Sequence, residues 1–205
     1  MTKGAFMSKN NKNDDKLNEK PAFSLAEKSL FDSRTVFVFG EINMDLAKQV
    51  TANLIALAQA SKDPINMIIN SPGGHIESGY TIHDMIKFID APVNVIGTGW
   101  VASSGALIYL GADKNRRFSL PNTRYLLHQP IGGMQGAAAD IEIQVEQIMK
   151  MWDRLNKLIA KETNNELKRI EKDTDRDYWL SAEEAIEYGI VRKIITSIKE
   201  LKSVK

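Results

Sequence analysis

The fold prediction starts from residues 97–108, which read Gly97-Thr98-Gly99-Trp100-Val101-Ala102-Ser103-Ser104-Gly105-Ala106-Leu107-Ile108. The apolar run Val93 to Ile96 predicts a strand that stops at the two glycines, and Ala106 to Leu110 predicts a buried helix. A serine on the first turn of such a helix lies where N–H groups and the helix dipole can stabilise an oxyanion. Serine at a helix N-cap is also ordinary structure, and Val101 stands where the hydrolase elbow Gly-x-Ser-x-Gly has its first glycine. The stretch alone therefore leaves both interpretations open.

The composition excludes several classes of protein. With 27 Lys and Arg against 26 Asp and Glu in 205 residues, no field of one sign favours nucleic acid or an anionic membrane. Cysteine is absent, which excludes a disulfide framework, a cysteine nucleophile and a thiolate metal site. No apolar run is long enough to span a bilayer, and the first residues lack the apolar core of a secretory signal. We expect one soluble, cytoplasmic domain.

Strand-like and helix-like segments alternate along the chain. The predicted strands are 35–39, 65–69, 93–96, 124–127 and 190–195. The predicted helices are 25–31, 45–61, 77–89, 106–110, 138–163 and a short one that opens at the capping box Ser181-Ala182-Glu183-Glu184 and ends at Gly189. This alternation implies βαβ crossovers and a parallel sheet, so the fold class is α/β.

Three parts of the chain are distinguished by composition. Residues 1–22 are polar and predict a disordered tail; a removable pro-segment and an upstream start with initiation at Met7 remain open. Residues 23–197 form the domain, and 198–205 a C-terminal tail. In the predicted helix 138–163 the apolar residues are spaced alternately by four and three, so it packs either on its own domain or on another subunit. They are Ile141, Val145, Ile148, Trp152, Leu155 and Ile159.

Groups suited to catalysis follow three predicted strands. Gly73 and Gly74 follow 65–69, Ser103 follows 93–96, and His128 follows 124–127. Open α/β sheets place their sites at these carboxyl ends, where a hydroxyl, an imidazole and free amides would supply a nucleophile, a base and an oxyanion hole. A carboxylate that orients the imidazole could come from the acidic run 173–177, although such runs more often form solvated surface. No spacing predicts a metal site or a phosphate loop.

Several motifs in one order resemble the proteolytic subunit of the Clp protease, the ClpP family, over about residues 30–195. They are Ile69-Asn70-Ser71-Pro72-Gly73-Gly74, Gly99-x-x-Ala102-Ser103-x-Gly105-Ala106, Leu120-Pro121-Asn122-Thr123-Arg124, His128-Gln129-Pro130, Asp140-Ile141-Glu142-Ile143, Asp173-Thr174-Asp175-Arg176-Asp177 and Leu180-Ser181-Ala182-Glu183-Glu184-Ala185.

The resemblance implies a serine peptidase that cleaves unfolded polypeptides. Ser103 matches the nucleophile, His128 the base and Asp177 the residue that orients the base. The backbone N–H groups of Gly74 and Ser104 match the oxyanion hole.

The resemblance further implies that substrate lies as an added strand between two segments, one carrying Gly73 and Ile76 and the other carrying Ile131. It implies a crotonase-like spiral of βαβ units whose protruding handle, about residues 131–163, combines a Gly-rich strand with one long helix. Heptameric rings would stack through the handles into a tetradecamer, with Asp175 and Arg176 pairing across that contact. A ring-shaped AAA+ unfoldase would use the ATP, and this chain would hold no cofactor.

Two departures from the family pattern keep alternatives open. The family's N-terminal hairpin has no clear counterpart in residues 1–30, and Ala137 and Ala139 replace polar residues of the ring contact. Both fit a divergent second paralogue that assembles with a standard subunit, either as a weakly active or as a structural member. A crotonase-type acyl-CoA enzyme would not need Ser103, and a Ser/Lys signal-peptide-type peptidase would need a membrane anchor.

Overall fold

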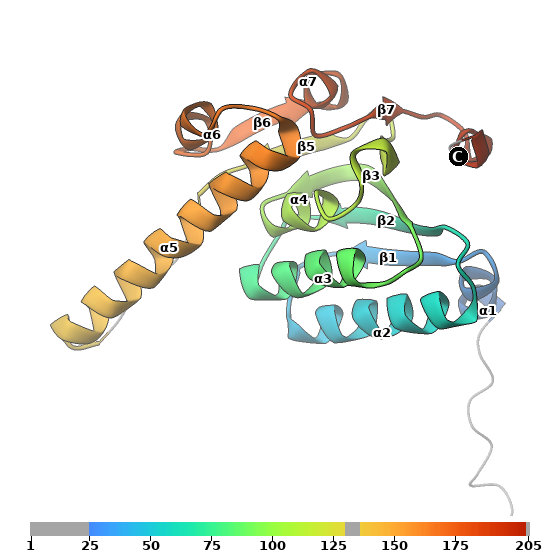
Figure 1. Cartoon of the computed structure of the whole chain (residues 1–205), viewed down its shortest axis with the longest axis horizontal. Coiled ribbons are helices and arrows are strands. Elements are labelled where there is room, and N and C mark those ends of the chain that lie inside the picture. The colour runs from blue at the N-terminus through green and yellow to red at the C-terminus, as the bar shows by residue number, and fades with distance from the viewer. Residues whose placement is uncertain (1–24, 130–135, 204–205) are drawn as a thin grey trace, which may run out of the picture.

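A computed structural model describes residues 25–129 and 136–203 of the chain (Figure 1). The strands are β1 Thr35–Phe39, β2 Ile65–Ser71, β3 Val93–Ala102, β4 Arg117–Ser119, β5 Arg124–Leu127, β6 Tyr178–Ser181 and β7 Lys193–Ile194. The helices are α1 Leu25–Asp32, α2 Met44–Ala60, α3 Ile76–Phe88, α4 Ser104–Tyr109, α5 Ala138–Thr163, α6 Leu167–Asp173 and α7 Ala182–Glu187, with short 3-10 turns η1 Lys114–Arg116 and η2 Ile198–Ser203. The predicted tail 1–22 lies outside the described residues.

The strands form a largely parallel sheet, as the alternation of strands and helices predicts. Its order is β1-β2-β3-β4-β7, all parallel, while β5 runs parallel to β3 and carries β6 antiparallel at its other side. Helices α2 and α3 lie along one face of β1 and β2 (Figure 1). Their inward residues, which include Val50, Leu54 and Ile82, are buried with Val36 and Val38 of β1 in the main core. The predicted α/β class is confirmed.

The prediction that the third strand stops at the glycines is wrong. Strand β3 continues through Gly97 and Gly99 to Ala102, and it changes partner on the way. Residues 95–97 pair with β4, whereas 100–102 pair with β5. Gly99 has φ +62°, and a Cβ at Gly97 would lie 2.4 Å from the Tyr125 hydroxyl. The glycines therefore allow the strand to bend past a crowded point rather than ending it.

Smaller differences concern short strands. The predicted last strand, 190–195, is reduced to Lys193–Ile194, and β4 and β6 were not predicted. Strands of two to four residues are too short for a period-two pattern to stand out from loops. The capping box is confirmed, because the Ser181 Oγ accepts from the Glu184 N–H and the Glu184 carboxylate accepts from the Ser181 N–H.

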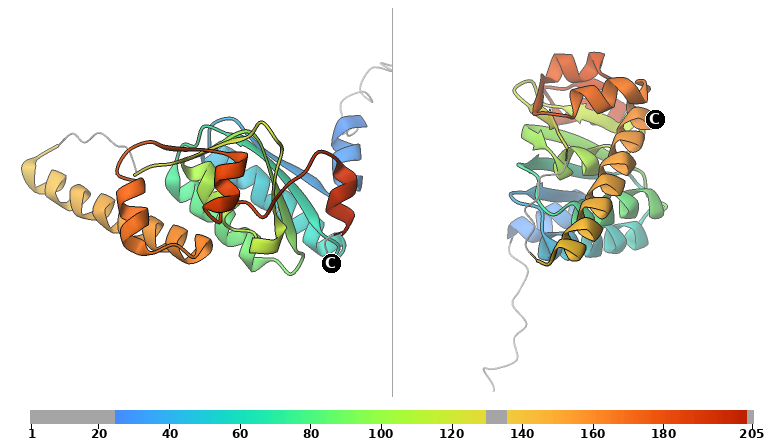
Figure 2. Two further views of the ribbon diagram at one scale, coloured as in Figure 1. Left: turned by 90° about the horizontal axis from the view of Figure 1, so that it is seen from above. Right: turned by 90° about the vertical axis from the view of Figure 1, so that its left-hand side faces the viewer.

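Helix α5 extends away from the body of the molecule (Figure 2). Along its outer part Ile143 is 59% exposed, Val145 44% and Met149 52%, whereas Ile141 and Ile148 are half-buried. Towards its end the helix packs on its own domain through the buried residues Leu155 and Ile159. The inner end of the predicted seam thus packs on its own domain, and its use as a contact with another subunit stays a prediction. The Gly-rich strand predicted for the handle lies mostly in 130–135, outside the described residues.

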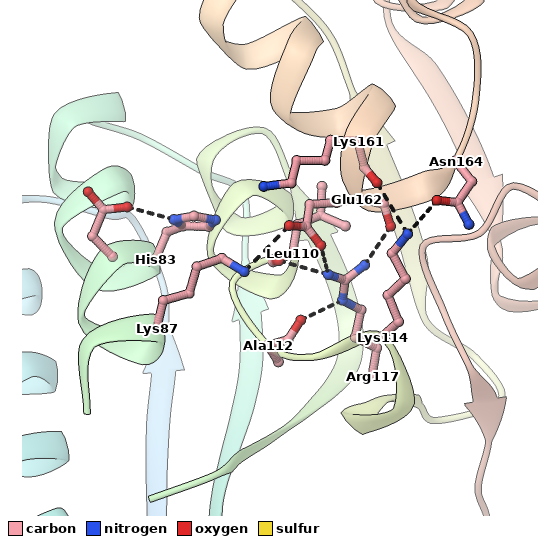
Figure 3. Close-up of polar contacts among 10 residues, drawn as sticks. His83, Lys87, Leu110, Ala112, Lys114, Arg117, Lys161, Glu162 and Asn164 are labelled. Carbon is pink, nitrogen blue, oxygen red and sulfur yellow. Dashed lines mark hydrogen bonds and ion pairs between the residues drawn. The ribbon is translucent and has the colours of Figure 1, made fainter. Parts of the chain in front are cut away.

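A buried ion pair fixes the inner end of α5 to the body (Figure 3). Arg117 of β4 is 1% exposed and donates to the carbonyls of Leu110, Ala112 and Glu162 and to the Glu162 carboxylate. The Lys87 ammonium of α3 lies 3.4 Å from the same carboxylate. Burial disfavours the charged form of Glu162, but hydrogen bonding and charge from Arg117, together with Lys87, outweigh it and hold its pKa below 4.5.

We expect Glu162→Gln to lower the free energy of unfolding by about 3 kcal/mol near neutral pH, because Arg117 is left buried without its counter-charge. A carboxyl whose pKa is lower in the folded state stabilises the fold above its unfolded pKa and loses that effect as the pH falls. The difference from the unmodified protein should therefore narrow below pH 4.5. Urea unfolding at one fixed protein concentration measures it, with the exposed Glu171→Gln as control. A pH-independent difference would contradict the ion-pair explanation.

Candidate active site

Ser103 lies at a strained turn between β3 and α4. It is the N-cap of α4 and has φ 55° and ψ −123°, a conformation that L-residues rarely adopt. Its N–H donates to the Leu126 carbonyl of β5 at 3.0 Å, which ties the turn to the neighbouring strand. The side chain accepts no capping hydrogen bond from the helix. Ser103 therefore does not act as an ordinary N-cap serine, because its hydroxyl does not cap the helix.

Two glycines at the end of β2 lie against this turn. A Cβ at Gly73 would lie 2.5 Å from the Ser103 Cβ and 3.1 Å from its Oγ, so the serine hydroxyl lies beside the Gly73 backbone. A Cβ at Gly74 would lie 2.3 Å from the Ile42 carbonyl oxygen, and φ at both glycines is positive. No other residue type fits either position without moving backbone.

Backbone amides remain free next to Ser103. Within the described part of the chain, neither the Gly74 N–H nor the Ser104 N–H has a hydrogen-bond acceptor. Ser104 itself is buried, and its hydroxyl donates to the Gly74 carbonyl at 3.3 Å, which joins the two segments. Free N–H groups on both sides of a hydroxyl are what an oxyanion hole requires.

His128 and Asp177 are brought together by the pairing of β5 with β6. The antiparallel register ends with Leu127 opposite Tyr178, so the next residues on the two strands, His128 and Asp177, also face each other. The His128 Nδ1 and the Asp177 Oδ1 are 3.4 Å apart, somewhat longer than a good hydrogen bond. The imidazole is 13% exposed and the carboxylate 61% exposed. The two side chains are in contact, but the contact is not tight.

Among the described residues, no hydrogen bond joins His128 to Ser103. The His128 Nε2 is buried without a hydrogen-bond partner among the described residues, so no hydrogen bond links it to Ser103. Parallel pairing of Ala102 with Leu126 nevertheless places both residues just past the same edge of the sheet. Catalytic hydrogen bonds that are long or open in an unliganded protein commonly tighten when substrate binds.

The other predicted site residues fall in several places. Ile76 begins α3 next to the glycines and is half-buried, whereas Ile131 lies outside the described residues. Asp175 and Arg176 are exposed beside Asp177, and their charged groups are 4.0 Å apart. Within the described residues no group of three or more His, Asp or Glu side chains could hold a metal ion. None of the described helices is long and apolar enough to cross a membrane.

Two supporting residues were not singled out in the sequence. The Ser71 hydroxyl accepts from the Gly73 N–H at 3.0 Å and donates to the Gly40 carbonyl at 2.6 Å, which holds the glycine turn in place. Gln129 donates from its N–H to the Thr174 carbonyl and from its Nε2 to the Asp175 carbonyl, both at 2.7 Å. Both residues lie inside quoted motifs, Ser71 two residues before Gly73 and Gln129 directly after His128, and that proximity was the available signal.

Ser103 lies on a strained strand-to-helix turn beside two backbone N–H groups that have no acceptor among the described residues. A histidine–aspartate pair lies at the edge of the same sheet. This combination is typical of α/β serine hydrolases. The family model described as Clp protease matches residues 18–198. The ATP-dependent Clp protease proteolytic subunit 3 of Rhizobium etli is 58% identical over 184 residues, covering 90% of this chain and 95% of that protein. Subunit 2 of Gluconobacter oxydans is 58% identical over 178 residues, covering 86% of this chain and 80% of that protein.

Solved structures agree with the sequence relatives. ClpP1 from Listeria monocytogenes has a TM-score of 0.78 and 51% identity, covering 86% of this chain and 99% of the other. A mutant of the same protein has a TM-score of 0.81 and 52% identity, with the same coverage. The chain therefore belongs to the Clp protease family and is a serine-type proteolytic subunit, which confirms the resemblance and the crotonase-like spiral fold.

The backbone strain at Ser103 predicts that two inactive variants of this residue differ in stability. Replacing Ser103 by Gly relieves the positive φ, so we expect Ser103→Gly to be about 1 kcal/mol more stable than Ser103→Ala. Both proteins should be inactive, because both lack the hydroxyl. Urea unfolding of the two variants at equal protein concentration measures the difference. Equal stabilities would show that the turn is not strained.

Proposed function

We propose that Ser103, His128 and Asp177 form the catalytic triad of this peptidase. The observation that supports the proposal most directly is the meeting of His128 with Asp177 at the end of β5 and β6, beside the turn that carries Ser103. In this role His128 takes the proton of the Ser103 hydroxyl as the oxygen attacks a peptide carbonyl. Asp177 holds the imidazole in the required tautomer and stabilises the imidazolium that forms.

The remaining residues serve the intermediate and the substrate. The N–H groups of Gly74 and Ser104 donate to the oxyanion of the tetrahedral intermediate, and the protonated His128 then gives its proton to the leaving amine. Water then attacks the acyl-enzyme carbonyl: His128 takes a proton from the water and passes it to the Ser103 oxygen as the ester bond breaks and the carboxylic acid product leaves. An extended polypeptide binds between the segments that carry Gly73, Ile76 and Ile131 through its backbone, so side-chain selectivity is low.

The assembly is part of the proposal. The exposed apolar residues on the outer part of α5 bury against handles of a second ring in a tetradecamer of two heptamers, since the single chain leaves them in water. The chain binds neither nucleic acid nor membrane and needs no cofactor. A partner AAA+ unfoldase uses ATP and feeds unfolded polypeptide into the chamber. The cytoplasmic location stays a prediction.

A second role is favoured by two features of the candidate site. The contact between His128 and Asp177 is long, and the His128 Nε2 has no hydrogen-bond partner among the described residues, so the site is not aligned in the single chain. A weakly active or regulatory paralogue in a mixed barrel would have such a site until a partner subunit aligned it.

Hydrolysis of a short fluorogenic peptide by the purified protein separates the two roles. We expect activity that Ser103→Ala reduces at least a hundredfold, since removal of the nucleophile leaves only binding and oxyanion stabilisation. Mass measured under native conditions should correspond to about fourteen subunits, the family expectation. Covalent labelling by a fluorophosphonate, absent in Ser103→Ala, verifies the reactive hydroxyl. An inactive, unlabelled protein in smaller assemblies would support the second role.

Arg176 should link assembly to catalysis. It is 90% exposed in the single chain and adjacent to Asp177, so a contact across rings would also fix the segment that carries this carboxylate. We expect Arg176→Ala to lose stacked rings and peptidase activity together, measured by native mass and peptide hydrolysis. The exposed Lys172→Ala, on the preceding helix, is the control and should change neither. Stacked, fully active Arg176→Ala assemblies would contradict the link.

A further inference from the structure

A buried hydrogen bond joins the handle helix α5 to the segment that follows α6. Asn156 of α5 is 1% exposed and Thr174, at the end of α6, is 0% exposed. The Thr174 Oγ1 donates to the Asn156 Oδ1 at 2.9 Å and shares its proton with the Ile170 carbonyl, also at 2.9 Å. Buried polar groups that lose their partner carry the full cost of desolvation, so these two side chains move together or at a penalty.

From Thr174 the connection continues to the catalytic histidine. The Thr174 carbonyl accepts from the Gln129 N–H at 2.7 Å, and the Gln129 Nε2 donates to the next carbonyl, that of Asp175, at 2.7 Å. Gln129 directly follows His128, and Asp177 is three residues beyond Thr174. The segment held by Asn156 is thus hydrogen-bonded to one member of the pair and covalently continuous with the other.

From these contacts we infer that Asn156 and Thr174 are positioning residues for the base. The inference rests on the proposed roles of His128 and Asp177. It adds the hydrogen-bonded contacts through which a movement of the handle helix would change the positions of these two residues. Figure 1 shows α5, α6, β5 and β6 gathered at one end of the body, with the outer part of α5 projecting from it. A shift or rotation of α5 acts on Asn156, which transmits it through Thr174 and Gln129 to the distance between His128 and Asp177.

Thr174→Val tests this route, because valine keeps the branched shape and removes the hydroxyl. We expect kcat per active site, counted by fluorophosphonate titration, to fall about tenfold while KM stays within about twofold, since the base is misplaced and substrate binding is not. Hydrogen–deuterium exchange at the Gln129 amide should become faster. Thr174→Ser, which restores the hydroxyl, should return both values to those of the unmodified protein.

Thr163→Val is the matched control. Thr163 of α5 is also a buried threonine whose hydroxyl donates to a helix carbonyl, that of Ile159, but it has no hydrogen bond to the segments that carry His128 or Asp177. This variant should leave kcat per site and exchange at Gln129 unchanged. A purely structural role of Thr174 would reduce the number of titrated sites and the melting temperature at constant kcat per site, and that result would overturn the inference.

Failure of this inference can be distinguished from failure of the proposed function. If the unmodified protein is no more active than Ser103→Ala, the proposed function fails. Exchange at the Gln129 amide then decides the coupling by itself. Faster exchange in Thr174→Val than in Thr163→Val supports the connection from the handle, and equal exchange overturns it. If the unmodified protein is active and Thr174→Val matches it in kcat per site and exchange, the inference fails while the function stands.

Discussion

The handle is inserted between two strands that pair with each other, and this constraint governs the rest of the molecule. Strand β5 ends at Leu127, the chain passes through α5 and α6, and it returns at Tyr178 directly opposite. The first residue beyond β5 is His128 and the last before β6 is Asp177. The candidate base and the carboxylate predicted to orient it therefore lie where the chain leaves the sheet towards the handle and where it returns after α6.

The two sides of the site are held with unequal strength. The turn at Ser103 is fixed by the Leu126 carbonyl and by close packing of Gly73, in the middle of the sheet. Asp177 is 61% exposed and lies 3.4 Å from His128, at the edge of the sheet. Under the proposed roles, the nucleophile lies on a turn packed into the core, whereas the base and its carboxylate partner lie at the sheet edge where the chain leaves for α5 and returns from α6. Preorganisation of the oxyanion hole and alignment of the base would then depend on different parts of the structure.

The success of the sequence prediction follows from the strength of each local signal. The strand 35–39 and the helix 138–163 agree with the structure, because an apolar β-branched and aromatic run and a long helical period leave little ambiguity. The strand 124–127 also agrees, although it has only four residues. The end of β3 was misplaced because Gly97 and Gly99, usual strand breakers, here serve a bend between two partner strands. Asp177 could not be chosen by pattern, since an exposed carboxylate in an acidic run is indistinguishable from solvated surface until the β5–β6 register is known. The resemblance supplied that assignment.

Hydrogen bonds and a buried ion pair hold the inner end of α5 against the body of the molecule. Arg117 and Lys114 bind the last carbonyls of the helix, at Glu162 and Lys161, where cations also oppose the negative end of the helix dipole. Asn156 lies about two turns further out, beyond these contacts and before the exposed part. A helix held at one end and loaded at the other moves most at its tip and little at Asn156. A given displacement of the exposed outer part would therefore reach Asn156 only as a small adjustment, and small adjustments are what a 3.4 Å histidine–aspartate contact needs to tighten.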